Sequence, residues 1–231
     1  MNVLPSSKMR TSNTRAWMAA TLTGIVIPVS ILVWLFRTSS SLLPAGGPVL
    51  TLGLMGVGII GAAAVGQFRM GVLLALTNAI CLLALAITLG LPGLPHLLPV
   101  SGVMVIASLS FAARGALFTK TMKHKAWLMA LFVVLGEASV LLIAAVFPGV
   151  LPGWFLALLP AQWANIAIQT ALAGNGMLPA ASALLALAGT AATTLLAARF
   201  WFRPWPYPLM FTTWLALSAV VYFNLTGTAL A

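Results

Sequence analysis

The stretch Trp127 to Pro148, WLMALFVVLGEASVLLIAAVFP, decides the fold class of this chain. It is long and apolar enough to cross a bilayer, because one spanning helix needs roughly 20 apolar residues. Near its middle lies Glu137, the only acidic residue among 231. A short basic run precedes it, made of Lys120, Lys123, His124 and Lys125. The stretch therefore predicts a membrane-spanning helix with one carboxyl group at membrane depth.

The composition extends this prediction to the whole chain. Hydrophobic residues make up 62% of the sequence and charged residues 5%, whereas a soluble domain carries about 25% charged residues. A chain with so little charge cannot cover its own surface in water, so we expect an all-α, polytopic integral membrane helical bundle. The net charge is +10, and the basic residues flank apolar runs, where they set orientation and contact anionic lipid headgroups. We therefore expect an anionic bilayer as partner and no nucleic acid.

Eight apolar runs divide the chain. We predict a cytoplasmic N-terminal segment at residues 1–16, a single transmembrane helical domain at 17–226 and a short tail at 227–231. The first run lacks a convincing cleavage site and is longer than a usual signal core, which indicates an uncleaved signal-anchor with a cytoplasmic N-terminus. The composition favours a bacterial inner (plasma) membrane. The runs lie near residues 17–36, 49–65, 71–89, 100–118, 127–148, 153–173, 178–198 and 209–225.

The sixth run leaves two topologies open. Pro160 interrupts it, since proline removes a backbone donor and clashes with the preceding turn. With eight full spans, eight basic residues lie on the cytoplasmic side and three outside. If the broken run enters the membrane and returns, Arg199 and Arg203 move inside, and the distribution becomes ten against one. Segment length favours eight spans, and the positive-inside rule favours seven spans with a re-entrant segment. We expect about eight transmembrane helices, with seven plus a re-entrant segment as the alternative.

Glu137 is the first candidate ion- or substrate-binding residue. An ionised carboxylate inside a bilayer needs a partner or water. Arg114, near the cytoplasmic end of the preceding span, is the natural partner. The pair predicts either a proton- or cation-linked site or a structural lock between two helices.

A second group of candidates consists of amide side chains. Gln162, Asn165 and Gln169 follow Pro160 with a spacing that places them on one helix face. Such a face suits either a polar pathway beside an interrupted helix or hydrogen bonds between helices. Asn78 is a further candidate, for which a hydrogen bond between helices is the favoured interpretation. Five tryptophans near the predicted span ends indicate interfacial anchors: Trp127, Trp154, Trp163, Trp201 and Trp205.

The missing residue types exclude several kinds of chemistry. With no aspartate and one glutamate, the chain has no acidic cluster for Mg²⁺-diphosphate substrates and no pair of catalytic carboxylates. The two histidines, His96 and His124, are predicted in loops on opposite sides, so they cannot share a metal or haem. Cys81 is the single cysteine. We expect no metal and no cofactor.

Three classes of function remain. The first is a small carrier or permeation protein with Glu137 as its ionisable site and the Gln162 face along the path. The second is a non-catalytic subunit or assembly factor of a larger membrane complex, or a homo-oligomer, suggested by small-residue seams on the second and seventh runs. The third is a lipid-modifying membrane enzyme. A carrier predicts a water-accessible Glu137, and a subunit predicts a packed Glu137 bonded to Arg114 with an exposed seam.

Overall fold

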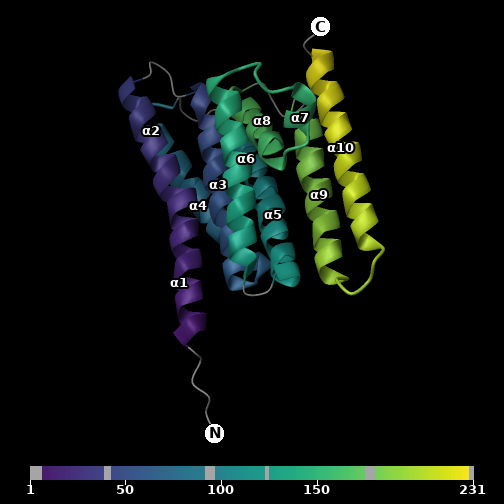
Figure 1. The fold of residues 1–231 in the computed structure, drawn as a ribbon. Helices are drawn as coiled ribbons and strands as arrows, with labels where there is room; N and C mark the ends of the chain where they lie inside the picture. Colours follow the sequence, from purple (N-terminus) through teal and green to yellow (C-terminus); the bar gives the residue numbers. More distant parts are fainter. Residues whose placement is uncertain (1–6, 39–42, 92–96, 123–124, 175–179, 229–231) are drawn as a thin grey trace.

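The computed structural model describes residues 7–38, 43–91, 97–122, 125–174 and 180–228, and these form an all-α bundle, as the composition predicts (Figure 1). The first apolar run forms α1, a single-turn π-helix η1 and α2 without interruption. The bounds of the helices are α1 Ser7–Thr21, η1 Leu22–Val26, α2 Ile27–Thr38, α3 Leu43–Val65, α4 Phe68–Thr88, α5 Leu97–Met122, α6 Ala126–Val146, α7 Gly153–Ala157, α8 Pro160–Leu172, α9 Ala181–Arg199 and α10 Pro206–Thr228.

Seven helical stretches within the described residues are long and apolar enough to span a membrane. The sixth apolar run is not one of them, because it is divided into α7 and α8 at Pro160. With 13 residues, α8 is about 20 Å long, shorter than the roughly 30 Å hydrocarbon core. Both short helices lie at the end of the bundle where α6 ends and α9 begins (Figure 1). The described helices therefore match the alternative topology of seven spans plus one broken segment, rather than the eight full spans that segment length favours.

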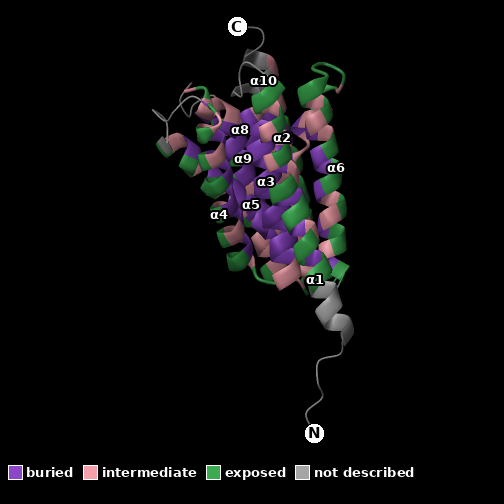
Figure 2. Cartoon of the chain, turned by 90° about the vertical axis from the view of Figure 1, so that its left-hand side faces the viewer, coloured by how far each residue is buried: buried purple, intermediate pink, exposed green. Residues whose placement is uncertain are grey.

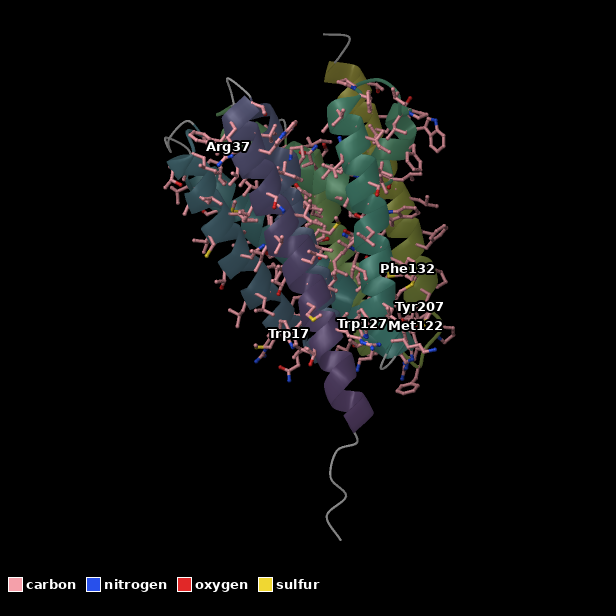
Figure 3. All side chains as sticks on the ribbon, turned by 60° about the vertical axis from the view of Figure 1, so that its left-hand side comes forward. Trp17, Arg37, Met122, Trp127, Phe132 and Tyr207 are labelled. Carbon is pink, nitrogen blue, oxygen red and sulfur yellow. The ribbon has the colours of Figure 1, made fainter. Side chains whose placement is uncertain are left out.

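This topology gathers the basic segments at one end of the bundle. The start of α1, the turn between α3 and α4, the end of α5, the start of α6 and the α9–α10 connection lie at the same end (Figure 1). The α9–α10 connection includes Arg203 and follows Arg199, the last residue of α9. Arg37 lies at the opposite end, whereas Trp17, Trp127 and Tyr207 lie near the basic end (Figure 3). For the described residues, the arrangement agrees with the charge distribution that the sequence associates with a broken sixth run, because the α9–α10 connection lies at the basic end and Arg37 lies opposite.

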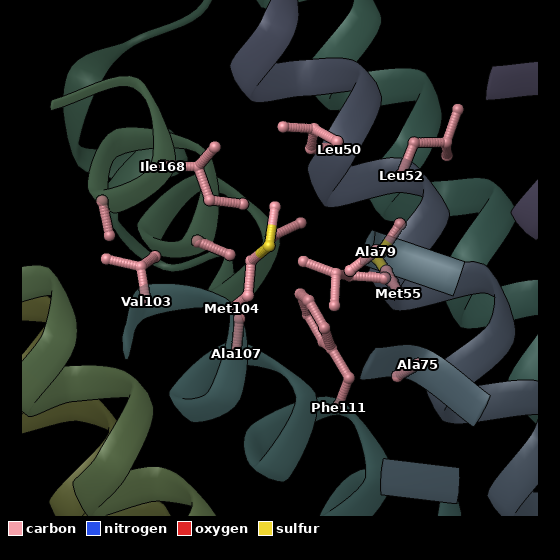
Figure 4. Packing of buried hydrophobic residues seen from close by; sticks show 14 of the residues in the cluster. Leu50, Leu52, Met55, Ala75, Ala79, Val103, Met104, Ala107, Phe111 and Ile168 are labelled. Atoms are coloured by element: carbon pink, nitrogen blue, oxygen red, sulfur yellow. The ribbon is translucent and has the colours of Figure 1, made fainter. Parts of the chain in front are cut away.

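The helix α3 forms the centre of the bundle. In its spanning part 89% of residues are buried, against 17% in α10 and 28% in α6, and Figure 2 shows the buried residues concentrated around α3. Leu50, Leu52 and Met55 of α3 pack with side chains of α4, α5 and α8 (Figure 4). Because α6 and α10 expose many apolar side chains, their outer faces suit contact with lipid.

Small residues allow α3 to approach its neighbours closely. A Cβ placed on Gly56 would lie 2.8 Å from the Gly24 nitrogen, and one on Gly115 of α5 would lie 2.3 Å from the Ile59 oxygen. Such distances leave no room for a side chain, so backbones themselves are in contact, as in small-residue seams of membrane helices. The seams predicted on the second and seventh runs are thus mainly internal: Gly58 and Ala62 of α3 and Ala186, Thr190 and Thr194 of α9 are buried.

Candidate functional site

The carboxylate of Glu137 lies inside the bundle and is bonded to two other helices. Glu137 is 9% exposed. Arg114 of α5 donates from Nη1 to Oε1 of Glu137, and from Nη2 to Oε2 over 3.4 Å. The backbone N–H of Ala161 in α8 donates to Oε2 over 3.1 Å. The predicted Arg114–Glu137 pair is therefore present, and a third donor that the sequence did not suggest completes it.

The third donor comes from the start of the broken helix. Pro160 occupies the first turn of α8, where its missing N–H costs nothing and its fixed φ favours helix entry. Ala161 then presents the first free N–H of the helix, and the N-terminus of a helix carries partial positive charge. Glu137 thus lies between a guanidinium group and a positive helix end, which is an environment suited to an anion.

The backbone oxygens exposed by the break are also bonded. Trp163 donates from Nε1 to the oxygen of Ala157 over 2.7 Å, and Trp214 of α10 donates from Nε1 to the oxygen of Leu158 over 3.1 Å. An irregular backbone is stable at membrane depth only when its polar groups are bonded inside the protein. The prediction of Trp163 as an interfacial anchor is wrong, because its side chain is fully buried and its N–H is bonded to the Ala157 oxygen at the break.

A cavity of about 310 Å³ lies beside the ion pair. Arg114 and Glu137 form its polar wall together with Thr190 and Thr194 of α9. The hydroxyl of Thr190 is bonded to its own helix, so the charged pair is the most polar part of the lining. The remaining lining residues are apolar and come from α5, from the break and from α10: Leu117, Phe118, Leu158, Leu159, Pro160, Met210, Phe211 and Trp214.

The packing of the helices explains this cavity. Among the described helices α6 packs mainly against α3 and α5, with smaller contacts to α8 and α1, whereas α9 and α10 pack closely against each other. Neither α9 nor α10 packs closely against α6. The residues that line the cavity come from α5, α6, the α7–α8 break, α9 and α10, so the cavity lies where α6 and the α9–α10 pair are not in close contact.

The amide candidates lie elsewhere. Asn165 is buried and donates to Oε1 of Gln162 over 3.3 Å. A Cβ on Gly47 of α3 would lie 2.6 Å from Oδ1 of Asn165 and 2.2 Å from Cγ of Gln169. The amide face therefore packs against α3, and none of its three residues lines the cavity beside Glu137.

Asn78 joins three elements at a distance from the ion pair. Its amide donates to the oxygen of Gly24 over 2.8 Å and to the oxygen of Gly53 over 3.0 Å. Gly24 belongs to the π-helix η1, and a π-turn changes the backbone bonding locally. Asn78 thus makes the hydrogen bonds between helices that the sequence favours, and one of them reaches the π-helical turn of the first span.

No group of three or more histidine, cysteine, aspartate or glutamate side chains is close enough to hold a metal ion in the described part of the chain. Arg114 contacts the Phe111 ring at 5.0 Å, and its Nε lacks a hydrogen-bond partner. Thr190 and Thr194 belong to the predicted small-residue seam of the seventh run, and their place in the cavity wall was not predicted. The sequence analysis did not identify Trp214 or the Ala161 N–H, although Pro160 indicated the break that supplies this N–H.

Comparison with known proteins adds no assignment: no family model, curated protein or solved structure matches this chain.

Proposed function

We propose that this protein is a small membrane carrier or permeation protein in which Glu137 is the ionisable site. One observation carries the proposal: the Arg114–Glu137 pair forms the wall of a cavity at the end of an interrupted helix. Half-helices whose N-termini point at anionic groups near the bilayer midplane are characteristic of transporter sites. Glu137 is 11 residues from the start of α6, about 16 Å along the helix axis, so it is close to half the membrane thickness.

The burial of Glu137 and the adjacent cavity also suggest how protonation could control the Arg114–Glu137 pair. Glu137 is buried enough to be costly as a lone charge, and it borders a space that can admit a small molecule or water. In our proposal, protonation of Glu137 weakens its bonds to Arg114 and to the Ala161 N–H, which frees two anion-binding donors. Release of the proton restores the ion pair and expels the anion.

The orientation and location belong to the same proposal. The basic end of the bundle faces the cytoplasm, so the N-terminus is cytoplasmic and the α7–α8 segment enters from the outer side. The host membrane is a bacterial inner (plasma) membrane with anionic headgroups.

Electrical recording on a solid-supported membrane tests the proposal. Proteoliposomes of the full chain are exposed to pH jumps and to jumps of small organic anions. We expect currents above those of protein-free membranes, and we expect Glu137→Gln to lose them while keeping its helical circular dichroism spectrum. Equal currents in both proteins, or none above the protein-free membrane, would overturn the proposal.

A second candidate function is a non-catalytic subunit or assembly factor. The specific observation in its favour is that Glu137 is packed and bonded to Arg114, as a helix lock would be. The buried seams on α3 and α9 argue against it. Native mass determination in a gentle detergent separates the two candidates: other subunits at fixed stoichiometry favour the complex, and a monomer or homo-oligomer favours the carrier.

A further inference from the structure

We propose that the cavity binds an amphipathic monocarboxylate, whose head group replaces the Glu137 carboxylate on Arg114 and whose apolar chain lies against α10. This inference rests on the proposed carrier function and names the substrate class of the same site.

The head-group preference follows from what the donors already hold. Arg114 offers two N–H groups to the two oxygens of one carboxylate, and the Ala161 N–H bonds to one of them. A planar guanidinium group matches the spacing of two carboxylate oxygens. The occupant of these donors is therefore a carboxylate in the resting state, and another carboxylate can replace it with the same geometry.

The chain preference follows from the walls of the cavity. Leucine, phenylalanine, methionine and tryptophan side chains form most of the lining. At about 310 Å³ the cavity is at the lower end of the range of ligand pockets, about 300–1,000 Å³. Phe211 lines it and is 56% exposed, so the cavity reaches the outer surface of the bundle. An apolar chain can enter there directly from the lipid.

The charges near Glu137 require one proton for each bound anion. Among the helices that pack against α6, α3 and α8 carry no charged residue. On α5 the other charged residue is Lys120, six residues beyond Arg114 and about 9 Å along the axis. On α1 the described charged side chain is Arg15, two residues before Trp17, which lies near the basic end of the bundle (Figure 3). The cavity-lining parts of α9 and α10 contribute threonines and apolar residues. One proton on Glu137 and one carboxylate on Arg114 therefore leave the net charge of the site unchanged.

Chemical rescue tests the head group. Glu137→Gln leaves Arg114 without its anion, so sodium decanoate should raise the melting temperature of this variant in lipid nanodiscs by several degrees. Arg114→Gln/Glu137→Gln is the matched control and should not respond. Decanol at the same concentration should have no effect, and decyl phosphate should have less effect than decanoate. Equal shifts in the single and double variants, or a larger shift with decyl phosphate, would overturn the proposal.

Direct binding keeps the proposal testable if Glu137→Gln does not fold. Radiolabelled decanoate should bind the unsubstituted full chain at pH 7.5, and the double variant should show only the background of lipid partition. If Glu137→Gln folds, it should bind decanoate at least about tenfold more tightly at pH 7.5, because its own competing carboxylate is gone. Binding that does not depend on Arg114 would overturn the proposal.

Two variants of α10 test the wall of the cavity that would contact the apolar chain of the ligand. Phe211→Ala removes a cavity-lining side chain, whereas Phe223→Ala removes one that is 69% exposed and outside the lining. We expect only the first to reduce the preference for decanoate over acetate, and equal effects would contradict the proposed location of the chain.

Decanoate binding without Glu137-dependent currents would refute the carrier function alone. Currents without decanoate binding would refute only the substrate class.

Discussion

The region around α3 and the region around the Arg114–Glu137 pair are held together in different ways. Around α3, glycines and alanines bring backbones into contact. The side-chain amide of Asn78 makes two buried hydrogen bonds that join η1, α3 and α4. Around the ion pair, the sixth apolar run is broken into α7 and α8. The indole N–H groups of Trp163 and Trp214 and the carboxylate of Glu137 make hydrogen bonds to the backbone groups at this break, and a cavity lies beside them.

The difference shows what small and large residues do in a membrane bundle. Without a strong hydrophobic drive between helices in lipid, close approach through small residues maximises van der Waals contact. Around the ion pair, large side chains such as Trp214 and Phe211 line a cavity that the charged groups border. The first region is therefore suited to stability, and the second to binding.

The largest expected effect comes from breaking the ion pair. Glu137→Gln leaves the partly buried Arg114 guanidinium without a counter-charge, and it weakens the bond that the Ala161 N–H makes. Removing one partner of a buried pair costs about 3–5 kcal/mol. We expect a loss of this size in the free energy of unfolding, measured by titrating the protein from mixed micelles with sodium dodecyl sulfate.

A double-mutant cycle sharpens this prediction. Arg114→Gln/Glu137→Gln removes both charges, so it should be more stable than the sum of the two single losses indicates. Strict additivity of the two losses would mean that the pair does not couple α5 to α6.

The second prediction concerns the tightly packed region. Gly115→Ala places a Cβ 2.3 Å from the Ile59 oxygen, so α5 must move away from α3. Overpacking of this kind costs about 1–3 kcal/mol. Gly102→Ala in the same helix has nothing within 4 Å of its Cβ and serves as the control. Equal stability of the two variants in the same titration would contradict the backbone contact between α3 and α5.

The third prediction tests the junction at η1. Asn78→Ala removes both donors to Gly24 and Gly53, which should cost about 1–2 kcal/mol. Thr77→Ala is the neighbouring control, because Thr77 is exposed. Hydrogen exchange of the first span should rise in the Asn78 variant, and an unchanged exchange pattern would show that η1 does not depend on this residue.

The smallest expected effect is at the break itself. Trp163→Phe retains a buried aromatic ring but loses the N–H bonded to Ala157, so we expect a loss of about 1 kcal/mol. Trp154→Phe is the control, since Trp154 is 57% exposed. The same denaturant titration measures both, and a larger loss in the Trp154 variant would argue against the role given to the Trp163 indole.

Much of the fold follows from local properties of the sequence. Apolar runs and their charged flanks depend only on neighbouring residues, so they indicate a membrane bundle and the positions of its spans. Pro160 indicates the break for a local reason, the loss of one backbone donor. Because a buried carboxylate requires a counter-charge, and because one arginine lies within the preceding span, the Arg114–Glu137 pair also follows from the sequence.

Tertiary structure alone decided what completes the site. Glu137 and Ala161 are 24 residues apart, and Trp214 and Leu158 are 56 apart, so no local pattern relates them. The same spacing rule that placed Gln162, Asn165 and Gln169 on one face could not tell which helix that face would meet. The sequence determined that this is a helical membrane protein with a charged pair and a broken helix. The packing of distant helices determined that the pair borders a cavity, because empty space depends on how whole helices are positioned against one another.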